Sequence, residues 1–209
     1  MLPLDTALSF FGLALLLGFT PGPDNLFVLM QSATQGRRAG FYVVLGLCAG
    51  LVVHTAAIAL GLAAMFAASA WAFTALKFAG AAYLVYLAWQ VLREPVGPLS
   101  LNPSGEVQSM KGMVRRGMVM NLTNPKVVFF FLALLPQFVD AQRGPVAGQI
   151  VLLGLIFVLS TLISFGAITY FAGAVRKLLQ RSTRAQRLLN QTAGMVFLGL
   201  ALKLALAER

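Results

Sequence analysis

The sequence carries little charge for its length. Only 11% of its 209 residues are Asp, Glu, Lys or Arg, against about 25% in a typical soluble domain. In contrast, 59% of the residues are hydrophobic and the mean hydropathy is +0.83. A soluble fold would expose so much apolar surface as one continuous patch. The composition therefore excludes an ordinary soluble domain and predicts an all-α integral membrane protein.

Residues that bind metals or carry out catalysis are also scarce. One cysteine, Cys48, excludes a disulfide within the chain. One thiol and one imidazole, that of His54, are too few for a zinc site. A membrane aspartyl protease needs two facing acids, and all acidic residues but one lie outside the apolar runs or at their ends. The sequence thus predicts no metal, no cofactor and no enzyme, although a membrane-embedded enzyme stays open as a remote alternative.

Six apolar runs are long enough to cross a bilayer, which takes about 20 helical residues. A connector rich in Pro, Gly and Ser, residues 93–111, divides the chain near its middle. We therefore expect one transmembrane domain, 1–209, built of a repeat at about 1–92, a cytoplasmic linker at about 93–111 and a repeat at about 112–209. The six predicted spans are 4–33, 41–66, 70–92, 112–139, 146–174 and 185–207.

The net charge of +10 is concentrated in alternate connectors between these runs. Basic residues accumulate in cytoplasmic loops of membrane proteins, so the pattern predicts that these connectors are cytoplasmic and that both termini lie outside. It also explains the charge without a nucleic-acid partner. The basic connectors carry Arg37 and Arg38; then Arg93, Lys111, Arg115 and Arg116; then Arg176, Lys177, Arg181, Arg184 and Arg187.

Proline interrupts the first and the fourth predicted spans. The first contains Pro21, Gly22 and Pro23, and the fourth contains Pro125. Because proline removes a backbone donor and clashes with the preceding turn, both helices should be broken. Three spans per half make the halves inverted in the membrane, and matched breaks in inverted repeats indicate a transporter binding site. A packed kink without a ligand is the alternative reading.

Each break is followed by an ionisable residue. Asp24 follows Pro23, and a carboxylate inside a span costs about 2.5–3.5 kcal/mol on insertion scales, so it is a functional candidate. Lys126 follows Pro125 at the start of a half-helix, where the helix dipole disfavours a cation. We expect the two to face each other and to pair when no substrate is present. Asp24 could instead serve simply as a helix cap.

An amino-acid zwitterion would suit this pair. Asp24 would hold the ammonium group, while Lys126 and the free amides near Asn124 would hold the carboxylate. Asn25 and Asn121 would add polar lining. A proton arriving from outside would neutralise Asp24 and release the ammonium group, so protons are the expected coupling ion.

His54 lies near the middle of the second span and is the other candidate for proton coupling. An isolated imidazole can equally be a packing residue. On the same span, Gly46 and Gly50 are spaced four residues apart, which is typical of close helix packing.

Several motifs occur in order along nearly the whole chain. They are Thr20-Pro21-Gly22-Pro23-Asp24-Asn25-Leu26, Gly36-Arg37-Arg38-Ala39-Gly40, His54, Lys77-x-x-Gly80, Asn121-Leu122-x-Asn124-Pro125-Lys126 and Leu135-Pro136-Gln137-Phe138. In these motifs the chain resembles the LysE/RhtB family of bacterial amino-acid exporters. The resemblance implies proton-driven export of amino acids across the bacterial inner membrane, with the cargo unspecified. Export of another small solute or of a cation on the same fold remains an alternative, and a homo-oligomer stays open.

Overall fold

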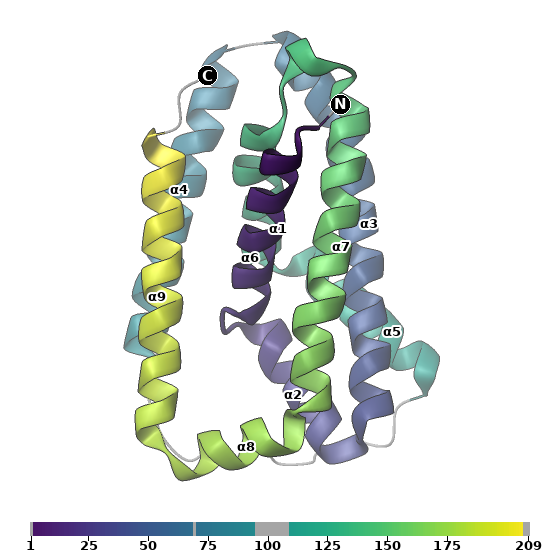
Figure 1. Ribbon diagram of the computed structural model, residues 1–209, viewed down its shortest axis with the longest axis vertical. Coiled ribbons are helices and arrows are strands. Elements are labelled where there is room, and N and C mark those ends of the chain that lie inside the picture. Colours follow the sequence, from purple (N-terminus) through teal and green to yellow (C-terminus); the bar gives the residue numbers. More distant parts are fainter. Residues whose placement is uncertain (1, 69, 95–108, 207–209) are drawn as a thin grey trace.

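The computed structural model describes residues 2–68, 70–94 and 109–206, and these are almost entirely helical, without a strand (Figure 1). α3 packs along α5 and α7, α1 along α7, and α4 along α9. The predicted linker 93–111 falls mostly outside the described residues. The helices are α1 (Leu4–Phe19), α2 (Pro23–Gln35), α3 (Arg37–Ala68), α4 (Ala70–Arg93), α5 (Met110–Thr123), α6 (Pro125–Phe129), α7 (Val146–Tyr170), α8 (Ala172–Arg181) and α9 (Thr183–Leu206), with a π-helical turn η1 (Phe130–Leu134) and 3-10 turns η2 (Leu135–Phe138) and η3 (Ala141–Arg143).

Five of the predicted spans coincide with helices long and apolar enough to cross a membrane. Three are straight and belong to α3, α7 and α9. Two are bent pairs, with 63° between α1 and α2 and 53° between α5 and the segment from Pro125 to Phe138. The remaining predicted span, 70–92, corresponds to α4, which has 24 residues. The all-helical membrane fold is confirmed, while the count of six spans and the inverted repeat stay predictions.

The two bends arise where the proline motifs predicted them. Thr20 ends α1 in an extended conformation, and Pro23 starts α2 as its first residue. Asn124 is likewise extended between α5 and α6, and Pro125 starts α6. Proline suits the first position of a helix because its missing N–H has no partner there anyway. Each span therefore consists of two half-helices whose free ends meet inside the bundle.

Small residues let α3 and α5 approach at backbone distance. A Cβ atom added to Gly46 would collide with the carbonyl oxygen of Val114 and lie 2.9 Å from the Cα of Gly117. One turn further along α3, a Cβ atom on Gly50 would meet the side chain of Asn121. The prediction that Gly46 and Gly50 form a packing surface is confirmed, and this surface fixes the position of Asn121.

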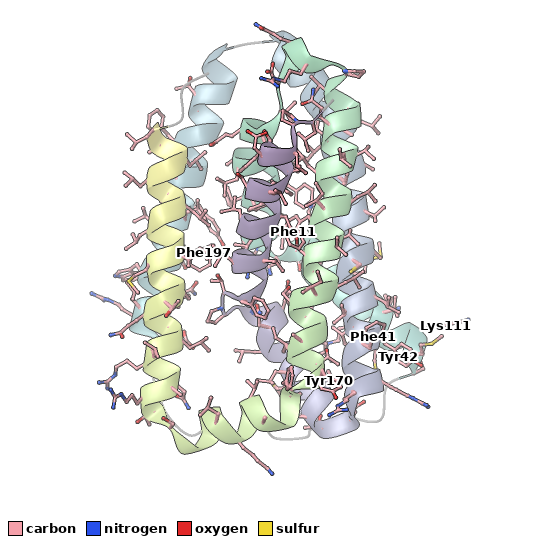
Figure 2. All side chains as sticks on the ribbon, viewed as in Figure 1. Phe11, Phe41, Tyr42, Lys111, Tyr170 and Phe197 are labelled. Atoms are coloured by element: carbon pink, nitrogen blue, oxygen red, sulfur yellow. The ribbon has the colours of Figure 1, made fainter. Side chains whose placement is uncertain are left out.

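The two ends of the bundle differ in charge. The start of α1 and the end of α9 lie at one end, the terminal end, as Figure 1 shows. At the other end, the basic end, α2 leads into α3 and α8 runs across the bundle into α9. Figure 2 places Tyr42 and Tyr170 near the basic end, and Arg37 stacks 4.2 Å from the Tyr170 ring centroid. Basic and aromatic residues at one level are typical of a membrane interface.

Candidate functional site

The two helix breaks bond directly to each other. The amide Nδ2 of Asn124 donates a hydrogen bond of 2.7 Å to Oδ2 of Asp24, which lies 100 residues earlier in the chain. In the opposite direction, Nζ of Lys126 donates to the carbonyl oxygens of Leu17, at 3.1 Å, and of Thr20, at 3.2 Å. Each break thus supplies polar partners to the other, and the predicted meeting of the two motifs is seen in this geometry.

Asp24 is buried, with 4% of its surface exposed, at the start of α2. Its neighbourhood is favourable because the N-terminus of a helix carries partial positive charge. Gly22 is the residue that caps α2, and no side chain caps it by a hydrogen bond. The hydrogen bond of Asp24 goes to the other half instead. The carboxylate therefore links the two halves rather than serving as a simple helix cap.

Lys126 is equally buried, with 6% exposed. Its own helix start disfavours a cation, but its side chain reaches the C-terminal end of α1, where the carbonyl groups lack helical partners. Asn124 completes the arrangement, because its Oδ1 accepts from the backbone N–H of Lys126 at 3.0 Å. An ammonium group has three donors. Two of those of Lys126 have these partners, which leaves one for a ligand.

The direct ion pair expected between Asp24 and Lys126 is not formed. In the part of the chain that the structure describes, the ion pair found within 4.0 Å joins Arg143 and Asp140 at the terminal end, away from the site. The carboxylate of Asp24 instead accepts a hydrogen bond from Asn124. The ammonium group of Lys126 donates to carbonyl groups of α1.

Both charged groups line one small cavity, here the central cavity, of about 20 Å³. That volume holds about one water molecule and is too small for an amino acid. Asn121 also lines it, and the side-chain oxygen of Asn121 is buried without a hydrogen-bond partner. Thr161 contributes a further polar side chain. The cavity therefore places two charged and two polar side chains in an otherwise apolar wall, and it is too small for a substrate in this conformation.

Asn25 and His54 do not line the cavity but contact residues that do. Asn25 donates from Nδ2 to the carbonyl oxygen of Gly18 at 2.7 Å, while its Oδ1 is buried without a partner. His54 is half-buried and does not line the cavity. Its Nε2 lies 3.4 Å from the carbonyl oxygen of Asn121, and its ring stacks on Phe131 at 5.3 Å. His54 thus contacts Asn121, which lines the cavity, but the imidazole does not line the cavity itself.

Aromatic rings pack beside the cavity. Phe157 lines the cavity and stacks on Phe131, with 5.5 Å between ring centroids, and its ring contacts that of Phe130 in a tilted arrangement at 4.7 Å. Phe10 of α1 extends the cluster, 5.7 Å from Phe130. Two of these rings belong to the π-helical turn η1, an irregularity that is frequent at functional sites. A packed aromatic cluster therefore adjoins the cavity through Phe157.

Some contributors were not predicted from the sequence. The carbonyl groups of Leu17 and Thr20 hold Lys126, and backbone atoms leave no sequence signal. Thr161 shares one face of α7 with Phe157 and Phe165, and all three line the cavity. The sequence signal for Thr161 was its position in an apolar run, four residues from Phe157 and from Phe165, which is the spacing of one helix face.

Comparison with known proteins gives relatives over most of the chain. It is 32% identical over 196 residues to an "Uncharacterized membrane protein" of Vibrio cholerae serotype O1, covering 93% of this chain and 94% of the relative. It is 31% identical over 195 residues to the "Homoserine/homoserine lactone efflux protein" of Salmonella typhimurium, covering 92% of each. It is 25% identical over 185 residues to the "Leucine efflux protein" of Enterobacter sp., covering 88% of each. No solved structure matches significantly.

A family model gives the same result for nearly the full length. The model for LysE type translocators matches residues 7–208, which include both helix breaks. The resemblance drawn from the two proline motifs is therefore confirmed, as is the prediction of a transporter rather than an enzyme. The protein belongs to the LysE type translocator family.

Proposed function

We propose that the protein exports amino acids from the bacterial cell by exchange with protons, with the substrate held between the two helix breaks. The observation that carries this proposal is the crossed bonding of the breaks, which sets a buried carboxylate and a buried ammonium group around one cavity. Intramembrane ionisable residues that face the interior of a bundle typically mark substrate or ion pathways.

The two charges match the two ends of a zwitterion. The ammonium group of an amino acid would bind Asp24, whose Oδ2 is already oriented by Asn124. The carboxylate of the amino acid would accept a hydrogen bond from the remaining N–H of Lys126. The unpaired oxygen of Asn121 would accept a further hydrogen bond from the ammonium group.

The names of the relatives support this class of substrate. The Salmonella relative is named for efflux of homoserine and homoserine lactone, and the Enterobacter relative for efflux of leucine. Both names describe amino acids or a close derivative leaving the cell. Because the named amino acids differ in their side chains, the relatives support amino acids as the substrate class but do not indicate which amino acid this protein exports.

Proton coupling would act at Asp24. A proton that enters from outside neutralises the carboxylate, which removes the main attraction for the substrate ammonium group and releases it outward. The protonated site then returns to face the inside, where Asp24 releases the proton and binds the next amino acid. His54 would have to act through the Asn121 carbonyl and is the weaker candidate for carrying the proton.

Transport requires the site to open. The cavity of about 20 Å³ cannot hold an amino acid, and the packed rings of Phe10, Phe130, Phe131 and Phe157 adjoin it. Rocking of one half against the other would separate Asp24 from Asn124 and Lys126 from Leu17, since all these bonds cross between the halves. With the basic end in the cytoplasm, the protein would lie in the inner membrane with both termini outside.

The test is efflux from cells that lack their own amino-acid exporters. The cells are loaded with dipeptides, and the release of each amino acid is followed for the wild type, Asp24→Asn and Lys126→Ala. The control variants Asp5→Asn and Lys177→Ala make the same chemical changes at exposed positions. We expect efflux by the wild type and the controls, and loss in both site variants. Efflux that survives in both site variants would refute the site, and no efflux of any amino acid by the wild type would refute the function.

A further inference from the structure

A second cavity lies on the other side of the first helix break. It has a volume of about 270 Å³, near the lower end of the range of about 300–1,000 Å³ for small-molecule pockets. We call it the apolar chamber. It extends from the break toward the basic end, because its walls come from α2, the end of α7, α8 and α9. Apart from Asn25 its lining is apolar, with Phe19, Pro21, Leu26, Leu29, Ala167 and Ile168 among the residues.

The apolar chamber and the central cavity share one wall. Asn25 lines the chamber, and its side chain bonds to the carbonyl oxygen of Gly18, which lines the central cavity. A Cβ atom at Gly22 would lie 3.4 Å from Nζ of Lys126 and 3.7 Å from Oδ1 of Asn25. Gly22 therefore lies next to both the ammonium group of Lys126, at the central cavity, and the side chain of Asn25, at the chamber wall.

Asn25 carries an unsatisfied group at this wall. Asn25 is buried, with 8% exposed, and its Oδ1 has no hydrogen-bond partner. Buried polar atoms are nearly always hydrogen-bonded. A ligand that brings a donor next to the chamber would satisfy this oxygen, as the ammonium group of an amino acid would. A lipid acyl chain has no donor and would leave the oxygen unpaired.

We propose that the apolar chamber receives the side chain of the exported amino acid, so that the substrates are neutral amino acids with a sizeable apolar side chain, such as leucine. The proposal rests on the proposed function, since it assumes a zwitterion held at Asp24 and Lys126. A basic side chain would bring an unpaired charge into an apolar lining, which is strongly unfavourable. A hydroxyl group would lose its hydrogen bonds to water there.

The first test fills the chamber. Ala167→Leu adds three carbon atoms to its wall, and Ala147→Leu makes the same change at an exposed position near the start of the same helix. Efflux of leucine, alanine and lysine is followed in dipeptide-loaded cells. We expect the wild type to release leucine faster than lysine. Ala167→Leu should lower the ratio of leucine to alanine efflux by about 10-fold or more, because steric pockets discriminate at this level, and Ala147→Leu should leave it unchanged.

The second test changes the chemistry of the lining. Leu26 is 44% exposed and lines the chamber, so Leu26→Glu places a carboxylate there without disrupting a packed core. We expect lysine efflux to rise relative to leucine efflux, and this variant also serves if Ala167→Leu fails to fold. Equal changes in leucine, alanine and lysine efflux in both variants would overturn the proposal and leave a lipid chain as the occupant, with the export function intact. A wild type that exports no amino acid would overturn both.

Discussion

Replacing Lys126 by methionine tests whether the two breaks act as one unit. Methionine keeps the length and the packing of the side chain but removes both hydrogen bonds to the carbonyl oxygens of Leu17 and Thr20. A hydrogen bond from a charged group contributes about 1.5–3 kcal/mol, so the two together contribute at most about 3–6 kcal/mol. Relief from burying the ammonium group offsets part of this. Because Asp24 lines the same small cavity, the variant also leaves a buried carboxylate without the nearby ammonium charge, so we expect a net loss of about 3 kcal/mol.

A double-mutant cycle separates this effect from simple packing. We expect Lys126→Met to lower the free energy of unfolding by about 3 kcal/mol, and Lys126→Met with Asp24→Asn to lose about 1–3 kcal/mol less than the sum of the single variants. The free energy of unfolding of all four proteins is measured by reversible unfolding in mixed detergent micelles. Strict additivity would refute the view that the carboxylate and the ammonium group stabilise each other across the breaks.

Three further predictions address the surroundings of the site. Gly46→Ala should lower the free energy of unfolding by about 1–3 kcal/mol, because the added methyl group would overpack against α5. The control Gly61→Ala, where an added Cβ meets nothing within 4 Å, should change it by less than about 0.5 kcal/mol. A similar loss of stability in both variants would contradict close packing of α3 on α5. His54→Phe should keep the stacking on Phe131 and retain proton-driven efflux, since the imidazole does not line the cavity; efflux that no longer responds to the proton gradient would make His54 the coupling residue. Asn124→Asp should keep the cap on α6 but place a second carboxylate beside Asp24. Two adjacent carboxylates retain a proton to higher pH than one does, so the pH profile of efflux should shift toward higher pH, and an unchanged profile would refute the contact.

The helix breaks could be predicted from the sequence because their causes are local. Pro23 and Pro125 cannot continue a helix, and each starts a new half-helix where the sequence places it. The close packing of α3 on α5 was also local in origin, since Gly46 and Gly50 have the spacing of a helix face. The proximity of Asp24 to the second break followed from assuming that the halves are inverted repeats.

The partners of the charged groups could not be predicted, because they depend on how the halves dock. Lys126 was expected to pair with Asp24, but it bonds to backbone carbonyl groups of α1 that no residue identity reveals. The sequence also indicated one span at 146–174, whereas the structure ends α7 at Tyr170 and turns into α8, which crosses the basic end (Figure 1). The turn at Phe171 lies within the apolar run, before the first basic residue Arg176, so the composition of the run did not mark it.

The zwitterion is the central claim, and binding of altered substrates tests it most directly. The amino acid that the wild type exports fastest is compared, by titration calorimetry on the purified protein, with its N-acetyl derivative and its methyl ester. The first derivative lacks the ammonium group that Asp24 would hold, and the second lacks the carboxylate that Lys126 would hold. We predict that the intact amino acid binds at least about 10-fold more tightly than either, which corresponds to about 1.4 kcal/mol. Equal affinity for the N-acetyl derivative would contradict the role of Asp24 and with it the site between the two breaks.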